Sequence, residues 1–262
     1  MYGLIRVATP MLPDGAAFWL PWLGWLALGN ILYAGWVALR QNDLNLLAGY
    51  ASVAHIGFGF LGVACGTAAG TAGAVLVMVA YGLNSALLYG LNGWLRQRIG
   101  STLMERYGGL LQVMPFAGGM LALGLLAGCG VPGFAGFMGE VHVFVAASGQ
   151  SWWWTAAAMW GAMILAGVYM LRTIRLVVHG TAPERLEKEP DVGHWWYRLP
   201  YALLAAGLIW FGLWPRAITD KARPAGTAVA RVQPTAEEPV APMPVAASPG
   251  MLAFDTEQEG RR

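Results

Sequence analysis

The sequence predicts an all-α, polytopic membrane protein, on three observations. Of its 262 residues, 57% are hydrophobic and only 11% are charged, whereas soluble domains carry about a quarter charged residues. Between positions 15 and 95 the only charged or histidine side chains are Arg40, Asp43 and His55, so apolar stretches exceed the roughly 20 residues that cross a bilayer. Many of the thirteen tryptophans lie near the ends of these stretches, as in an interfacial aromatic belt.

The apolar stretches divide into a bundle of about six transmembrane helices plus one broken helix. Pro132 and Gly133 interrupt the broken one, and an interrupted backbone persists in lipid only against protein or a water-filled cavity. The predicted crossings are 17–39, 44–65, 70–95, 109–130, 152–172 and 200–216, with the broken helix over 131–149.

Five regions follow from this division. If the chain crosses the membrane in seven successive passages, Arg40 and Arg172 lie on opposite faces of the membrane. The last region is rich in Pro, Ala, Thr and Glu without apolar periodicity, so we predict disorder there. The regions are an N-terminal helix remnant and loop (1–16), the transmembrane core (17–172), an interfacial linker (173–199), a last transmembrane helix (200–216) and a disordered tail (217–262).

Several kinds of chemistry are not indicated. The net charge of +2 gives no reason to expect nucleic acid. Cys65 and Cys129 stand in apolar segments without a CxxC partner and are expected to be buried hydrophobic side chains. Nucleotide loops, nucleophile–base pairs, haem motifs and iron–sulfur spacings are not found, so we expect no cofactor or metal on this chain. Proton or ion movement and membrane scaffolding remain.

Glu140 is the sharpest candidate for a functional residue. A carboxylate inside the membrane costs about 3 kcal/mol or more, so it must face a polar cavity, meet a partner or carry a proton. Beside the break at Pro132, such a group suits a proton relay; the alternative is a structural acid bonded to a carbonyl freed at the break. His142 lies two residues on, about 200° around a helix, and is expected to pack as a neutral side chain.

Other polar residues could line a path to Glu140. His55 is the only titratable group inside its crossing; it suits a second proton relay, or it is a hydrogen-bonded core residue. Tyr81 and Asn84 are three residues apart and share a helix face, where they could hold water. Asn45 begins the second crossing, and Pro132 marks the polar pocket that these channel-lining residues would share.

Three stretches resemble the antiporter-like membrane subunits of respiratory complex I, and chain M (chain 4) above all. The similarity covers about residues 2–216, which is roughly the C-terminal half of the family chain. The stretches are 43-DLNLLAGYASVAHIGFGFLG-62, 78-MVAYGLNSALLYGLNGWLRQR-98 followed by 107-YGGLLQVMP-115, and 130-GVPGFAGFMGE-140.

The resemblance implies an antiporter-like helical bundle in which buried Lys, His and Glu residues form a hydrated line. Glu140 matches the family carboxylate on the broken helix, and His55 matches the family histidine. The family lysine falls at Asn45 and a second family histidine at Tyr81, so two titratable groups are neutral here. The first inverted repeat of the family chain is not in this sequence.

The resemblance further implies a membrane-arm subunit of a proton-translocating NADH:quinone oxidoreductase, contributing a partial proton channel. It would be a multi-pass protein of the inner (cytoplasmic) membrane and have no redox centre of its own, with quinone, NADH, FMN and iron–sulfur clusters on partner subunits. Its partners would be lipid, other membrane-arm subunits and a separate chain supplying the missing N-terminal half. The alternatives are a non-pumping accessory subunit, or the antiporter-like subunit of a cation/proton antiporter, a membrane-bound hydrogenase or a bicarbonate-uptake complex.

Overall fold

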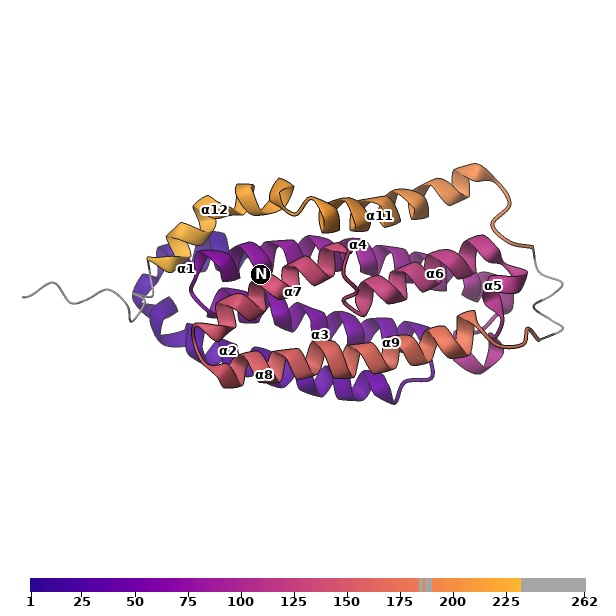
Figure 1. Ribbon diagram of the computed structural model, residues 1–262, viewed down its shortest axis with the longest axis horizontal. Helices are drawn as coiled ribbons and strands as arrows, with labels where there is room; N and C mark the ends of the chain where they lie inside the picture. The colour runs from indigo at the N-terminus through magenta and orange to yellow at the C-terminus, as the bar shows by residue number, and fades with distance from the viewer. Residues whose placement is uncertain (184–185, 187–189, 232–262) are drawn as a thin grey trace, which may run out of the picture.

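The computed structural model describes residues 1–183, 186 and 190–231, and in these ranges the chain is a bundle of helices without a β-sheet (Figure 1). The predicted all-α class is therefore confirmed. The elements are η1 (Leu4–Ala8), α1 (Thr9–Met11), α2 (Pro13–Leu39), α3 (Leu44–Ala64), α4 (Ala68–Ile99), η2 (Met104–Arg106), α5 (Leu110–Val113), α6 (Pro115–Gly128), α7 (Ala135–Ser148), α8 (Trp152–Met159), η3 (Trp160–Ala166), α9 (Gly167–Thr173), η4 (Ile174–Val178), α11 (Trp195–Leu213) and α12 (Arg216–Ala230).

Long apolar helices lie side by side along the bundle (Figure 1). Within the described ranges, four are long and apolar enough to cross a membrane: α2, α3, α4 and the continuous run from α8 to η4, Trp152–Val178. The helices α11 and α12, which meet at a bend of 66°, are long and apolar enough only when taken together, as a broken span or a re-entrant loop. The chain is thus a multi-pass membrane protein, as its composition predicts.

The helices α6 and α7 share one broken passage. Each has 14 residues, about 21 Å of helix, which is shorter than the roughly 30 Å hydrocarbon core. They follow one another along α4: a Cβ built on Gly124 would lie 2.9 Å from Leu88, and one on Gly139 would lie 2.8 Å from Val77. The stretches predicted as two successive crossings, 109–130 and 131–149, therefore cross once.

Because residues 109–149 cross the membrane once and not twice, the basic residues after them lie at the opposite end of the bundle from the predicted one. Arg172 donates hydrogen bonds to the Leu39 carbonyl oxygen at 2.7 Å and to Asn42 Oδ1 at 2.6 Å. It therefore lies at the same end as Arg40, which follows α2 directly, and not on the opposite face as the threading of seven passages predicts.

The last helical segment differs from the sequence-based boundaries. Its first part, α11, begins at Trp195 and not at residue 200. Residues 217–230, expected to belong to a disordered tail, lie in α12, which begins at Arg216, and Ala222 and Val229 are buried there. The remainder of the predicted tail, 232–262, lies outside the described residues.

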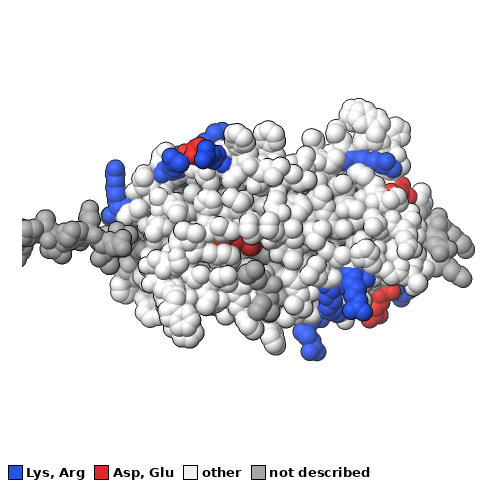
Figure 2. Space-filling view, viewed as in Figure 1, with Lys and Arg blue, Asp and Glu red and all other residues white. Residues whose placement is uncertain are grey.

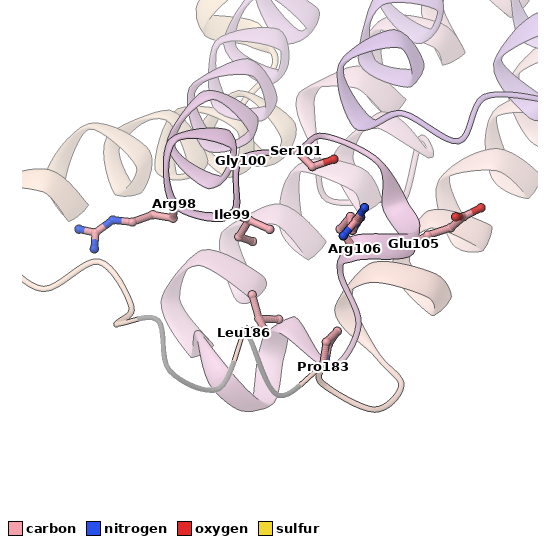
Figure 3. Close-up of a pocket in the computed structure, with 8 residues that line it drawn as sticks. All are labelled: Arg98, Ile99, Gly100, Ser101, Glu105, Arg106, Pro183 and Leu186. Carbon is pink, nitrogen blue, oxygen red and sulfur yellow. The ribbon is translucent and has the colours of Figure 1, made fainter.

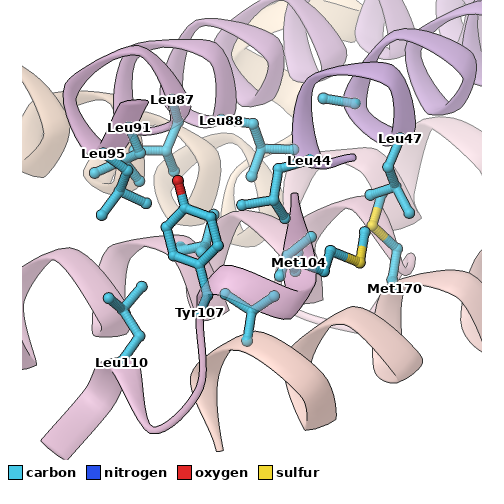
Figure 4. Packing of buried hydrophobic residues seen from close by; sticks show 14 of the residues in the cluster. Leu44, Leu47, Leu87, Leu88, Leu91, Leu95, Met104, Tyr107, Leu110 and Met170 are labelled. Atoms are coloured by element: carbon cyan, nitrogen blue, oxygen red, sulfur yellow. The ribbon is translucent and has the colours of Figure 1, made fainter. Parts of the chain in front are cut away.

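The largest buried cluster lies where α3 begins and α4 ends. Figure 4 shows the Tyr107 ring among leucines of both helices, including Leu44 and Leu91. The Tyr107 hydroxyl donates a hydrogen bond to the Ser101 carbonyl oxygen at 2.5 Å. Burial, with the charge of Asp43, raises the pKa of Tyr107 to about 12, so the phenol stays neutral in this core.

Asp43 caps the N-terminus of α3. Its carboxylate accepts hydrogen bonds from the backbone N–H of Asn45 at 2.8 Å and of Leu46 at 3.1 Å, and from the Thr102 hydroxyl. Burial raises the pKa of this carboxyl, but the hydrogen bonds and the nearby Arg96 charge outweigh it and hold the pKa below its usual value. The charged form is therefore favoured by folding.

We expect the stability contributed by Asp43 to depend on pH. Because its folded pKa is below the unfolded value, the contribution is complete above the unfolded pKa and is lost as pH falls through the folded pKa. Asp43→Asn keeps a capping side chain but removes the charge at the helix N-terminus, so it should lower stability by about 0.3–1 kcal/mol at neutral pH and flatten the acid side of the profile. Thermal unfolding between neutral and acidic pH measures this; the exposed Asp14→Asn is the control, and an unchanged acid limb in Asp43→Asn would contradict it.

Candidate functional site

The interruption between α6 and α7 is built around glycines. Gly130 and Gly133 have φ angles of +73° and +104°, which glycine adopts at little cost. A Cβ at Gly130 would lie only 2.9 Å from Glu140 Oε2. The chain therefore needs glycine there both to turn and to let the break approach the carboxyl group. Pro132 lies in this turn with its side chain exposed.

Glu140, Tyr81 and His55 come together from three helices. Glu140 on α7 is 3% exposed, and its Oε1 accepts a hydrogen bond from the Tyr81 hydroxyl on α4. His55 on α3 stacks on the Tyr81 ring, with centroids 4.0 Å apart and planes 12° apart. Its Nδ1 lies 3.6 Å from Glu140 Oε1, which is beyond a good hydrogen bond but within ion-pair range.

Several polar atoms around this cluster have no protein partner in the described part of the chain. They include both ring nitrogens of His55, Asn84 Oδ1 and the Tyr169 hydroxyl, all buried. Buried polar groups are normally hydrogen-bonded, and polar atoms left free by the protein are the usual partners of internal water. The cluster thus has the chemistry of a small hydrated pocket around one carboxyl group.

Tyr169 on α9 was not predicted from the sequence. Its side chain is almost fully buried, its hydroxyl has no hydrogen-bond partner among the described residues, and a Cβ on Gly167 of the same helix would lie 3.9 Å from Cys129 Sγ beside the break. A single tyrosine in an apolar helix gives no sequence signal, because the same pattern describes an ordinary core residue. Only the packing of α9 against the break reveals it.

The structure separates other predicted residues from the cluster. Asn45 is in the first turn of α3, ten residues or about 15 Å along the helix from His55, so it does not line the same pocket. Asn84 lies near the cluster, one turn of α4 from Tyr81, and a Cβ on Gly128 would be 3.1 Å from its Nδ2. His142 is half-buried, and its Nδ1 lies 2.7 Å from the Met138 carbonyl oxygen of its own helix.

The charge distribution isolates Glu140. Figure 2 shows the basic side chains gathered toward the two ends of the bundle, with one acidic spot over α7; Glu140 is the only acidic residue in that helix. Among the described residues, no group of three His, Cys, Asp or Glu side chains is placed to hold a metal ion. Tyr81 and His55 are thus the nearest polar neighbours of a single isolated carboxyl group.

Comparison with known proteins points to one family. The model of the family described as "NADH:quinone oxidoreductase/Mrp antiporter, TM" matches residues 1–166. NAD(P)H-quinone oxidoreductase chain 4 3 of Trichormus variabilis is 35% identical over 228 residues, 84% of this chain and 42% of the relative. NADH-ubiquinone oxidoreductase chain 4 of Chondrus crispus is 30% identical over 223 residues, 84% of this chain and 44% of the relative.

Solved structures share the fold. A chain of respiratory complex I from Thermus thermophilus with bound NADH superimposes with a TM-score of 0.80 at 29% identity, covering 88% of this chain and 48% of that one. A chain of the Mrp complex from Dietzia sp. has a TM-score of 0.74 at 19% identity, covering 88% and 50%, and shows the fold alone. The chain spans less than half the length of the curated relatives it matches.

Proposed function

Because this chain belongs to the NADH:quinone oxidoreductase/Mrp antiporter transmembrane family, we propose that it is a membrane-arm subunit of a proton-translocating NADH:quinone oxidoreductase and contributes a partial proton channel. The observation that carries this proposal is Glu140, buried at a helix break between Tyr81 and His55. A buried acid beside unwound backbone suits a group that takes up and releases a proton.

The two oxygens of Glu140 face different surroundings. Oε1 is bound by the Tyr81 hydroxyl and lies near His55, whereas Oε2 is directed toward Gly130 in the break. With Oε1 held by Tyr81, Oε2 is the oxygen that would take up a proton, and release toward the Oε1 side would require rotation of the carboxyl group. His55 would act as the second relay, because an imidazole can carry a proton and its two ring nitrogens have no hydrogen-bond partner among the described residues.

The channel on this chain would be partial. Asn45 and Tyr81 stand where the resembling family has titratable groups, so water and neighbouring chains must complete the path. We propose that other membrane-arm subunits do so, including a chain that supplies the N-terminal half, within an inner (cytoplasmic) membrane. Quinone, NADH, FMN and iron–sulfur clusters would belong to partner subunits, so that this chain is a translocase component without its own redox centre.

Purification of the tagged full chain in mild detergent tests this assembly. We expect it to bring down quinone-linked redox subunits and a chain resembling the missing half, identified by mass spectrometry. Recovery with the subunits of a cation/proton antiporter, a membrane-bound hydrogenase or a bicarbonate-uptake complex would replace the proposal by that alternative. Recovery of the chain alone would contradict the proposal and each of these alternatives.

A non-pumping accessory subunit is the second candidate, favoured by the neutral residues Asn45 and Tyr81. Under the pumping proposal, Asn45→Lys with Tyr81→His should change the rate of proton translocation a few-fold, because Tyr81 touches Glu140 directly. The control is Tyr89→His, a half-exposed tyrosine of the same helix. Normal assembly with unchanged proton stoichiometry and rate in the double variant would favour the accessory role.

A further inference from the structure

A pocket of about 500 Å³ opens between η1, α4, α11 and α12. Its inner wall is apolar, with Val75 and Met78 from α4 and Phe211 from α11. Basic side chains line it as well: Arg6 of η1 and Lys221 of α12. The pocket therefore combines an apolar wall with two cationic groups.

The two cations have no acidic partner within the described residues. Arg6 and Lys221 are both exposed, and the surface ion pair of α12 joins a different basic residue, Arg223, to Asp220 at 3.3 Å. Two like charges that share a pocket without a counter-charge repel each other and attract an anion. The pocket therefore favours a negatively charged ligand.

The pocket lies where a lipid headgroup would be found. The amphipathic helix α12 bends by 66° from α11, packs its small residues against the start of α4 and carries its charges at one end of the bundle (Figures 1 and 2). Amphipathic helices with basic residues on the polar face are typical of the membrane interface, and basic pockets between transmembrane helices bind anionic headgroups.

A second pocket, of about 530 Å³ at the other end of the bundle, differs in chemistry. It also contains two arginines, Arg98 and Arg106, but Glu105 adds a carboxylate (Figure 3). The Arg98 and Glu105 side chains point in opposite directions in Figure 3, and Arg98 lies over the Trp94 ring at 5.5 Å. Its charges are mixed and its arginines do not converge in that view, so it favours a single anionic group less than a pocket lined by two cations and no acid.

We propose that the pocket between η1 and α12 binds one anionic glycerophospholipid. Its phosphate would lie between Arg6 and Lys221, and one acyl chain would run along Val75 and Met78. None of these residues belongs to the Glu140 cluster, so a test of the lipid site does not depend on whether Glu140 is a proton relay. A bound lipid would join the two ends of the described chain, η1 and α12, to the start of α4.

Native mass spectrometry of the full chain in detergent tests the site, with phosphatidylglycerol as the anionic probe and phosphatidylcholine as the neutral one. We expect one phosphatidylglycerol to remain bound under conditions that remove phosphatidylcholine. Arg6→Gln combined with Lys221→Gln should weaken its binding by at least about tenfold, since each basic residue near the surface contributes to the attraction.

Matched variants keep the test specific. Arg223→Gln on the same helix and Arg98→Gln in the other pocket should bind phosphatidylglycerol as the parent chain does. Met78→Ser should weaken binding while both cations remain, because it alters only the apolar wall. Equal retention of both lipids, no loss in the double variant, or full displacement by inorganic phosphate would each overturn the proposal, the last by showing a simple anion site.

Discussion

Replacement of Glu140 by Gln is expected to lower the rate of proton translocation by roughly a hundredfold while the chain still assembles. Glutamine keeps the size of the side chain and an oxygen that can accept from Tyr81, but its amide does not exchange a proton at neutral pH. Positioned groups that transfer protons typically contribute a factor of about a hundred or more. Proton uptake driven by quinone reduction in reconstituted vesicles measures the loss.

His142→Gln is the matched control, because it removes a titratable group two residues away on the same helix. Since His142 is directed to the carbonyl of Met138, we expect proton translocation to be unchanged. Glu140→Asp should retain part of the activity because it keeps the carboxyl group. Unchanged translocation in an assembled Glu140→Gln complex would refute the relay role, and complete loss of assembly in all three variants would show a structural role.

Gly73→Ala is expected to destabilise the bundle by about 2 kcal/mol, as overpacking of a close helix contact does. A Cβ at Gly73 would lie 2.8 Å from the Cβ of His142 and 3.1 Å from the Gly139 carbonyl oxygen. Neither atom is the free end of a flexible side chain, so α4 and α7 must separate. The thermal unfolding midpoint in detergent should fall by roughly 2–4 °C for each kcal/mol lost.

Gly93→Ala on the same helix is the control. No atom lies within 4 Å of a Cβ at Gly93, so alanine should leave stability unchanged or raise it by up to about 1 kcal/mol through its better helix propensity. If both substitutions shifted the unfolding midpoint equally, the close approach of α4 and α7 would not explain a loss of stability in Gly73→Ala.

The sequence predicts the fold class well because its evidence is local. The low charge and the long apolar stretches need no knowledge of packing, and they identify a multi-pass helical bundle and the crossings α2, α3 and α4. Local hydropathy is a poor guide to the passage containing Pro132, because two 14-residue helices end to end read like two crossings. Their packing in succession along α4 is a tertiary fact.

The same division holds for the candidate site. An isolated carboxyl group in apolar sequence identifies Glu140, since an ionisable side chain inside a membrane segment is costly and therefore rare without a functional or structural reason. Its partners do not follow from spacing: Tyr81 and His55 reach it from other helices. Asn45, on the same helix as His55, is about 15 Å away.

The sequence by itself thus determines that the chain is a membrane bundle with one acid at a helix break. Tertiary structure alone decides that α6 and α7 cross once, that residues 216–230 form a helix and which side chains surround Glu140. Hydropathy and helix length are summed along the chain, whereas hydrogen bonds and stacking depend on which faces of α3, α4, α7 and α9 meet. Those contacts join residues that are tens of positions apart.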